Sequence, residues 1–143
     1  MFSILHITDL HRSTTDPISN PELLSALISD RERYERESPP IRAPDAIVVS
    51  GDLIQGVGLD AADYEQELSA QYTAAYQFIV SLTERFLGGD RSKVVIVPGN
   101  HDIDWNAAFA SMEVVSDAKP PKLPEALYEP GSPYRWDWKS RQL

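Results

Sequence analysis

The sequence predicts an α/β domain built around a parallel sheet, and three observations support this prediction. Three short runs, residues 2–8, 46–50 and 94–97, are rich in Ile, Val and Leu and almost free of charge. Such runs are typical of strands buried on both faces of a sheet. Helical patterns separate them, and each run ends in a polar cluster. Because the carboxyl ends of parallel strands meet at one edge, we expect the three clusters to converge there.

Two helices are predicted between the strands. The first begins at Asn20-Pro21-Glu22, with Asn as the cap and Pro at the first helical position, and is expected to end near residue 37. The second is predicted over residues 60–87, where apolar side chains recur every three or four residues before Gly88-Gly89. This stripe, which we expect to pack on the sheet rather than on a partner helix, consists of Tyr64, Leu68, Tyr72, Ala75, Ile79, Leu82 and Phe86.

The polar clusters at the strand ends contain residue types that bind metals. Each has an ordinary interpretation by itself: a solvated loop, a turn, or a turn followed by the cap of a helix over residues 105–112, with Asp102 or Asp104 as that cap. Glycine at a strand exit permits a sharp turn and a close approach of the backbone. The three clusters in chain order are Asp9-Leu10-His11, Gly51-Asp52 and Gly99-Asn100-His101-Asp102. Their shared position at strand ends favours a metal site.

The order of these clusters resembles the calcineurin-like metallophosphoesterase family over residues 2–104. The resemblance implies an α/β layered sandwich with a two-metal hydrolase site. It implies that Asp9 and His11 bind the first metal, that Asp52 bridges both metals, and that Asn100 binds the second. Imidazole and oxygen ligands suit Mn, Fe, Zn or Ni, of which we favour Mn. Two such divalent ions lower the pKa of a bridging water.

The same resemblance assigns catalytic roles to two further residues. His101 would contact the scissile phosphate or protonate the leaving group, and Asp102 would orient His101. The implied activity is hydrolysis of a phosphomonoester or phosphodiester by a metal-activated hydroxide. The loop over residues 55–60 leaves the Gly-Asp cluster directly, so it is either adjacent to the substrate or a plain connector.

The sequence also departs from the resembled family, which completes its site with later histidines. The chain has three histidines, and none follows His101; His6 lies inside the first apolar run and is expected to be a core or sheet residue. Residues 116–133 contain five prolines and predict an irregular loop, and residues 134–139 alternate like the start of a strand. We therefore expect residues 1–143 to be the N-terminal portion of a single metallophosphoesterase domain whose second sheet is largely missing. A natural C-terminal strand or a tail that docks on a partner is the alternative.

Two further interpretations of function stay open. The chain is either a catalytically incomplete module that acts with a partner chain, or a non-catalytic α/β interaction domain. The second requires Asp9, His11 and Asp52 to lie apart.

Composition limits the partners. The net charge of −9, from 13 basic and 22 acidic residues, opposes non-specific binding to nucleic acid or an anionic membrane. The absence of cysteine excludes disulfides and thiolate metal sites, and the N-terminal residues predict neither a signal peptide nor a membrane span. We expect a cytoplasmic protein with a phosphate-ester substrate and no membrane partner, and either a homo-oligomer or a completing chain. Nucleic acid stays open as a substrate, although nothing in the sequence indicates it.

Overall fold

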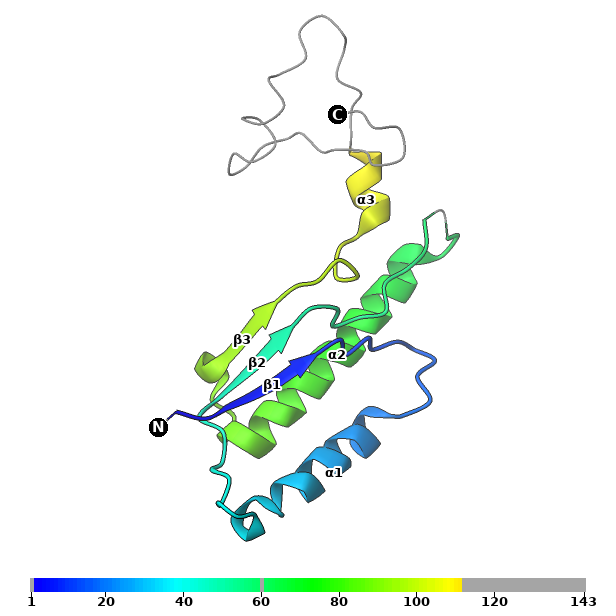
Figure 1. Ribbon diagram of the computed structural model, residues 1–143. Helices are drawn as coiled ribbons and strands as arrows, with labels where there is room; N and C mark the ends of the chain where they lie inside the picture. The colour runs from blue at the N-terminus through cyan, green and yellow to red at the C-terminus, as the bar shows by residue number, and fades with distance from the viewer. Residues whose placement is uncertain (1, 60, 112–143) are drawn as a thin grey trace, which may run out of the picture. The chain divides into compact units, whose positions relative to one another are not determined.

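The computed structural model describes residues 2–59 and 61–111 of the chain. The chain forms two units, residues 1–108 and 109–143, and the sheet and both long helices belong to the first. Three parallel strands, β1 (Ile4–Thr8), β2 (Ala46–Ser50) and β3 (Val94–Val97), form a sheet in the order β1-β2-β3 (Figure 1). The α/β fold predicted from the sequence is therefore confirmed. The predictions for residues 116–133 and 134–139 lie outside the described residues.

The register of the sheet brings the three strand ends level with one another. Thr8 at the end of β1 is opposite Ser50 at the end of β2, and Ser50 is opposite Val97 at the end of β3. Since all three strands run in the same direction, the polar residues that follow them leave the sheet at one edge. This is the edge at which the sequence predicted a metal site.

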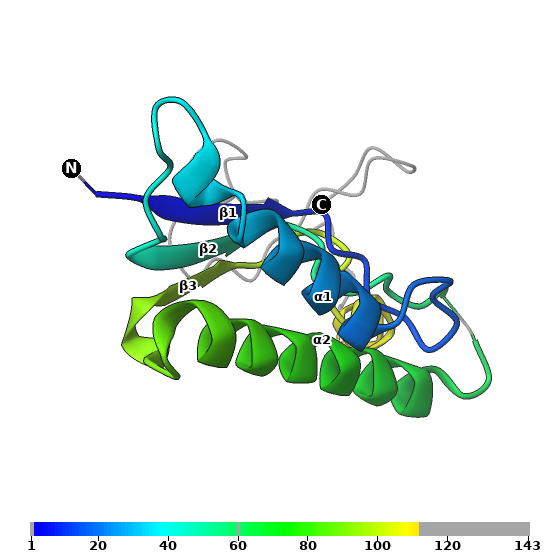
Figure 2. The ribbon, with the colours of Figure 1, turned by 90° about the horizontal axis from the view of Figure 1, so that it is seen from below.

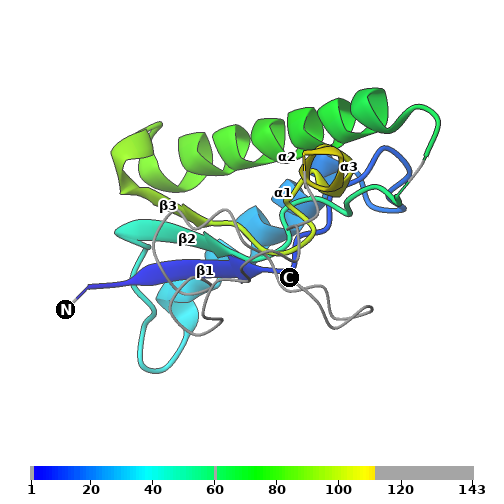
Figure 3. The ribbon, with the colours of Figure 1, turned by 90° about the horizontal axis from the view of Figure 1, so that it is seen from above.

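The two long helices, α1 (Asn20–Arg31) and α2 (Tyr64–Leu87), cover the same face of the sheet (Figures 2 and 3). Each strand is added beside the preceding one, and right-handed crossovers then place both connecting helices on one side. Ile47 and Val49 of β2 are fully buried beneath them. The core is completed by four buried side chains of α2, namely Phe78, Ile79, Leu82 and Phe86.

The other face of the sheet carries exposed apolar side chains. Ile4, Val95 and Val97 have exposed fractions of 54%, 52% and 49%. The prediction that all three strands are buried on both faces is therefore wrong for β1 and β3 within the described part of the chain. A continuous apolar run indicates that a strand is suited to burial on both faces. It does not show whether a second layer of helices or strands covers the other face.

The N-terminal cap of helix α1 lies one residue earlier than the sequence predicted. Ser19 rather than Asn20 is the cap, and its hydroxyl and backbone N–H pair with the backbone and side chain of Glu22 in a capping box. Asn20 instead donates its side-chain amide to the carbonyl oxygen of Ala74 in α2, at 2.8 Å. The helix ends at Arg31 instead of near residue 37, and a short 3₁₀ helix, η1 (Tyr34–Arg36), follows it.

Replacing Ser19 by Ala is expected to lower the free energy of unfolding by about 1 kcal/mol, because the first turn of α1 loses its side-chain cap. The Ser19 hydroxyl lowers the pKa of the Glu22 carboxyl, and the Ser19 backbone adds to this effect. Because the pKa of Glu22 is lowered in the folded chain, its bonds to Ser19 stabilise the fold at pH values above the ordinary carboxyl pKa. This stabilisation is lost as the pH falls through the lowered pKa of Glu22. Urea unfolding at neutral pH measures the change. Ser25→Ala, an exposed change inside the same helix, is the matched control and should be neutral or slightly stabilising.

Helix α2 begins at Tyr64 rather than at residue 60 and ends where predicted, with Gly88 in the left-handed region at φ 61°. The buried face differs from the predicted stripe, because Gln71 and Thr83 are also buried and Tyr64 is only half-buried. Phe78 is buried although the stripe omitted it, and Tyr72 is 41% exposed. Within residues 2–59 and 61–111, no helix is long and apolar enough to cross a membrane.

The remaining elements are short. A 3₁₀ helix, η2 (Arg91–Lys93), leads into β3, and α3 (Trp105–Ala110) follows the third polar cluster. The carboxylate of Asp104 accepts a hydrogen bond from the backbone N–H of Ala107 at 2.9 Å. Asp104 therefore caps α3, as one of the two sequence alternatives stated.

Candidate metal centre

The loops after β1 and β2 run side by side beyond the ends of their strands. The backbone N–H of His11 donates to the carbonyl oxygen of Asp52 at 2.8 Å, and that of Arg12 donates to Leu53 at 2.9 Å. The N–H of Gly51 in turn donates to the carbonyl oxygen of Val97 in β3, at 2.8 Å. These backbone bonds hold the first two polar clusters in register at the edge of the sheet.

Three of the predicted metal ligands have unusual backbone conformations. Asp9, His11 and Asp52 have φ values of 53°, 45° and 44°, and within the described ranges they are the non-glycine residues with positive φ. Asp and His tolerate this region better than most residues, but it still carries a conformational cost. Such a cost persists where the surrounding structure imposes it, as it does at many functional sites.

The side chains of these three residues converge. The Nε2 atom of His11 lies 3.8 Å from Oδ2 of Asp52 and 4.0 Å from Oδ1 of Asp9. Ligand atoms of His11, Asp52 and His101 all lie within 4.8 Å of one another. Two atoms bound to one ion at about 2.1 Å are at most about 4 Å apart. The distances from Nε2 of His11 to Asp52 and to Asp9 therefore fit a shared metal. The interaction-domain interpretation, which required Asp9, His11 and Asp52 to lie apart, does not agree with this geometry.

The state of the His11 ring also fits a bound cation. Its Nδ1 atom is buried without a hydrogen-bond partner, and its Nε2 atom is too far from both carboxylates for a hydrogen bond. Leaving a buried polar atom unpaired costs about 1–3 kcal/mol. The side chain of Asp52 is only 14% exposed, so its charge is partly removed from water. A cation beside Nε2 would neutralise the carboxylates and take Nε2 as a ligand, while Nδ1 would still lack a partner.

Asp52 is held by the third polar cluster. Its Oδ1 atom accepts a hydrogen bond from the backbone N–H of His101 at 3.0 Å, which leaves Oδ2 directed toward His11. Gly99 is packed so closely that an added Cβ would lie 2.3 Å from Oδ1 of Asp52 and 2.4 Å from its backbone nitrogen. The sequence predicted a close approach of Gly99 to an ion or a phosphate, and the close approach that the structure shows is to Asp52.

The ring of His101 is fixed by a backbone carbonyl. Its Nδ1 atom lies 2.6 Å from the carbonyl oxygen of Gln55, and its ring meets that of His11 edge to face, with the centroids 5.0 Å apart. The carboxylate of Asp102 has other partners: it accepts from the backbone N–H groups of Gly99 at 2.7 Å and Ile54 at 3.1 Å. Gln55, and not Asp102 as the sequence predicted, therefore makes the contact that orients the ring of His101. Asp102 instead connects the loop after β3 to the loop after β2.

A cavity of about 320 Å³ lies beside this cluster and is lined by both loops, including Gln55, Asn100, His101 and Trp105. Asn100 is exposed, and its backbone oxygen accepts a hydrogen bond from the indole N–H of Trp105 at 2.9 Å. Of the two interpretations of the loop after Asp52, this arrangement favours the one that places it next to a substrate.

Two nearby basic side chains serve other purposes. Arg12 is buried, and its guanidinium lies 3.0 Å from Asp16 and donates to the carbonyl oxygen of Ile18 at 2.8 Å, so it stabilises the loop before α1. His6 lies on β1 as a sheet residue, and its Nε2 atom is 2.7 Å from the hydroxyl of Ser50. Neither belongs to the cluster of His11, Asp52 and His101.

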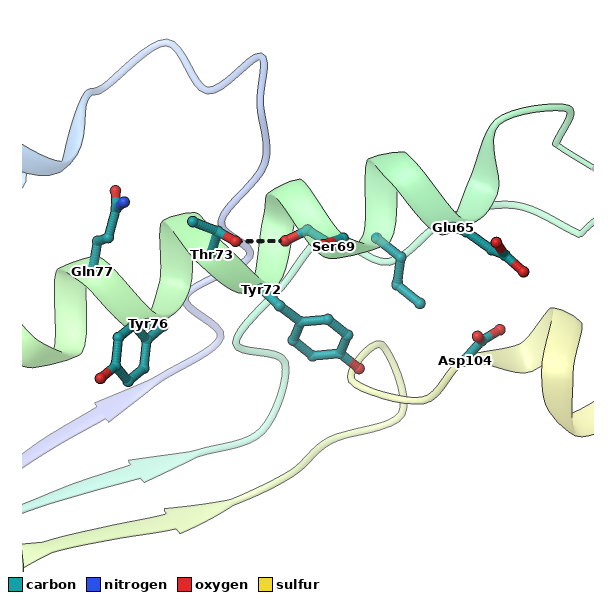
Figure 4. A pocket seen from close by; sticks show the side chains of 8 residues that line it. Glu65, Ser69, Tyr72, Thr73, Tyr76, Gln77 and Asp104 are labelled. Atoms are coloured by element: carbon teal, nitrogen blue, oxygen red, sulfur yellow. Dashed lines mark hydrogen bonds between the residues drawn. The ribbon is translucent and has the colours of Figure 1, made fainter.

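Helix α2 contributes two residues that sequence reasoning did not assign to the site. Gln71 is buried and bonds to the backbone of Gly56. The hydroxyl of Tyr72 donates to the carbonyl oxygen of Asp102 at 2.6 Å, and its side chain reaches toward the loop after β3 (Figure 4). Burial raises the pKa of Tyr72, and the charges of Asp102 and Asp104 raise it further. The sequence signal that could have identified Gln71 is its polar side chain at a position between Leu68 and Ala75 on the buried stripe.

A larger, open cavity of about 760 Å³ lies along α2, where it is lined by Tyr72, Tyr76 and Asp104 among others (Figure 4). It contains none of the candidate metal ligands. Of the two cavities, the smaller one is the one that Asn100 and His101 line.

Comparison with models of protein families gives a match. The model of the calcineurin-like phosphoesterase family matches residues 2–141. No curated protein and no solved structure matches the chain.

Proposed function

This chain belongs to the calcineurin-like phosphoesterase family, and we propose that it hydrolyses a phosphomonoester or phosphodiester with divalent metal ions held at the edge of its sheet. The observation that carries the proposal is the convergence of Asp9, His11 and Asp52, with Nε2 of His11 within 4.0 Å of both carboxylates. Asp9 and His11 follow β1, whereas Asp52 follows β2, so the fold is what brings the three residues together.

The donor set supports a first ion bound by Asp9 and His11, with Asp52 shared with a second ion that also uses the amide oxygen of Asn100. Two bound ions supply a hydroxide nucleophile from water and neutralise charge on the phosphate. The mixture of imidazole and oxygen donors suits first-row ions, and we propose Mn²⁺.

His101 is the proposed general acid. Because a carbonyl oxygen only accepts hydrogen bonds, the contact with Gln55 makes Nδ1 the donor and leaves Nε2 for the substrate. As an oxygen derived from water bonds to phosphorus, the bond from phosphorus to the leaving oxygen breaks, and that oxygen takes the proton from Nε2. Water then returns a proton to the ring. Asp102 maintains this arrangement by holding the two loops together.

Metal removal tests the proposal. Treatment of the chain with EDTA is expected to lower the hydrolysis of 4-nitrophenyl phosphate or bis(4-nitrophenyl) phosphate by about 100-fold or more, and added Mn²⁺ should restore it. The two substrates separate monoesterase from diesterase activity. The proposal fails if a folded sample, checked by circular dichroism, is inactive on both substrates with Mn²⁺, Fe²⁺, Zn²⁺ and Ni²⁺, or hydrolyses them equally well without metal.

A further inference from the structure

We propose that Gln71 is a positioning residue, which fixes the peptide group between Gln55 and Gly56 and, through it, the ring of His101. The proposal rests on the proposed function for the role of His101, and its geometry stands on hydrogen bonds within the described residues. Gln71 lies on α2, outside the three polar clusters.

Gln71 is 3% exposed, and both the oxygen and the nitrogen of its amide have hydrogen-bond partners. Its Oε1 atom accepts from the backbone N–H of Gly56 at 2.9 Å, while its Nε2 atom donates to the carbonyl oxygen of Gly56 at 3.3 Å and to Glu67 at 3.0 Å. A buried amide with these partners has one orientation, because turning it over would place like groups together. Gln71 therefore fixes Gly56 from the side of the helix.

The next step passes through a single peptide plane. The N–H of Gly56 and the carbonyl group of Gln55 belong to the same planar trans peptide, so they point in opposite directions. Gln71 holds the N–H end, and Nδ1 of His101 meets the carbonyl end at 2.6 Å. The plane cannot rotate without breaking both contacts, and each hydrogen bond polarises the other.

Gly56 allows the loop to lie against the histidine. Its φ is 76°, and an added Cβ would lie 3.2 Å from the carbonyl oxygen of His101 and 3.3 Å from its Nδ1 atom. The chain of contacts thus runs from α2 through Gln71 and the peptide to the imidazole ring. Its consequence is that Nδ1 of His101 keeps its proton directed toward Gln55, while Nε2, the atom proposed to give its proton to the leaving group, takes no part in this contact.

The first test is nuclear magnetic resonance of the metal-free chain with ¹⁵N-labelled histidine at about pH 9, where an ordinary imidazole is neutral. We expect the His101 ring of the wild type to carry its proton on Nδ1. In Gln71→Met, which keeps the volume but loses the hydrogen bonds, we expect a mixture of the two ring tautomers. Gln77→Met, on the exposed side of α2, is the matched control and should match the wild type.

A second readout separates positioning from general destabilisation. With Mn²⁺ bound, Gln71→Met is expected to lose about tenfold in kcat on phenyl phosphate and much less on 4-nitrophenyl phosphate, whose leaving group needs little protonation. Its affinity for Mn²⁺ should equal that of the wild type.

The outcomes distinguish the positioning role from the proposed function. A proton on Nε2 in the wild type, or an unchanged tautomer in folded Gln71→Met, would overturn the positioning role even if the enzyme is active. The wild-type spectrum decides the question if Gln71→Met does not fold. An inactive wild type with the expected tautomers would overturn the proposed function and leave the role of Gln71 in the geometry supported.

Discussion

Replacing Asp52 by Asn is expected to lower the Mn²⁺-dependent hydrolysis of phosphate esters by about 10³-fold or more, equivalent to about 4 kcal/mol of transition-state stabilisation. The change removes the charge that two cations would share, while the shape of the side chain stays the same. Asn also tolerates the φ of 44° at this position, and its oxygen can still accept from the backbone N–H of His101. The fold should therefore persist. Measurements of kcat/KM and of Mn²⁺ affinity by calorimetry test this prediction.

Asp63→Asn is the matched control, because it makes the same chemical change at an exposed residue whose side chain does not cap α2. It should keep the activity and the metal affinity of the wild type. If Asp52→Asn bound Mn²⁺ as tightly as the control and hydrolysed the ester at the same rate, Asp52 would not be the bridging ligand.

Much of the fold follows from the sequence because its signals are local. Each apolar run is a strand close to its predicted bounds. Because helices alternate with these strands, the strands are expected to be parallel, and a parallel sheet places the polar clusters at one edge. The cluster geometry was predictable for the same reason: Asp9, His11 and Asp52 directly follow strand ends that the register brings level.

Other features depend on competition between neighbours, which a linear pattern does not resolve. Ser19 and Asn20 are both good helix caps, and Pro21 is compatible with either choice. Ser19 caps α1, and the side-chain amide of Asn20 donates instead to Ala74 on another helix. Similarly, the apolar residues of β1 and β3 do not state whether a second layer covers them.

The hydrogen bond that orients His101, the proposed general acid, was not predictable from residue types. The atom that meets His101 is the backbone oxygen of Gln55, and every residue carries such an oxygen. Asp102 was the natural expectation because it is adjacent and charged, yet its carboxylate is taken by the N–H groups of Gly99 and Ile54. The buried position of Gln71 on α2 was the only part of this arrangement with a sequence signal.

Replacing Gly99 by Ala is expected to destabilise the chain by about 3 kcal/mol or more and to weaken Mn²⁺ binding at least about tenfold. The new Cβ would lie 2.3 Å from Oδ1 of Asp52, 2.4 Å from its backbone nitrogen and 2.9 Å from Cα of Gly51. Two of these atoms are backbone, so rotation of a side chain cannot relieve the clash. The loop after β3 must move away from Asp52, which breaks the hydrogen bond from His101 and displaces the proposed bridging carboxylate. Urea unfolding and Mn²⁺ titration measure the two effects.

The loss of glycine's freedom and the clash with Asp52 can be separated by a control. Gly58→Ala adds the same methyl group where no atom lies within 4 Å of the new Cβ and where φ is not positive. It should leave Mn²⁺ affinity unchanged and raise the free energy of unfolding by up to about 1 kcal/mol, since it reduces only the entropy of the unfolded chain. Equal behaviour of the two variants would show that the space between Gly99 and Asp52 is not limiting, and that the third polar cluster does not need close contact with the bridging carboxylate. A loss confined to Gly99→Ala ties the position of Asp52, and with it the metal site, to the absence of a side chain at Gly99.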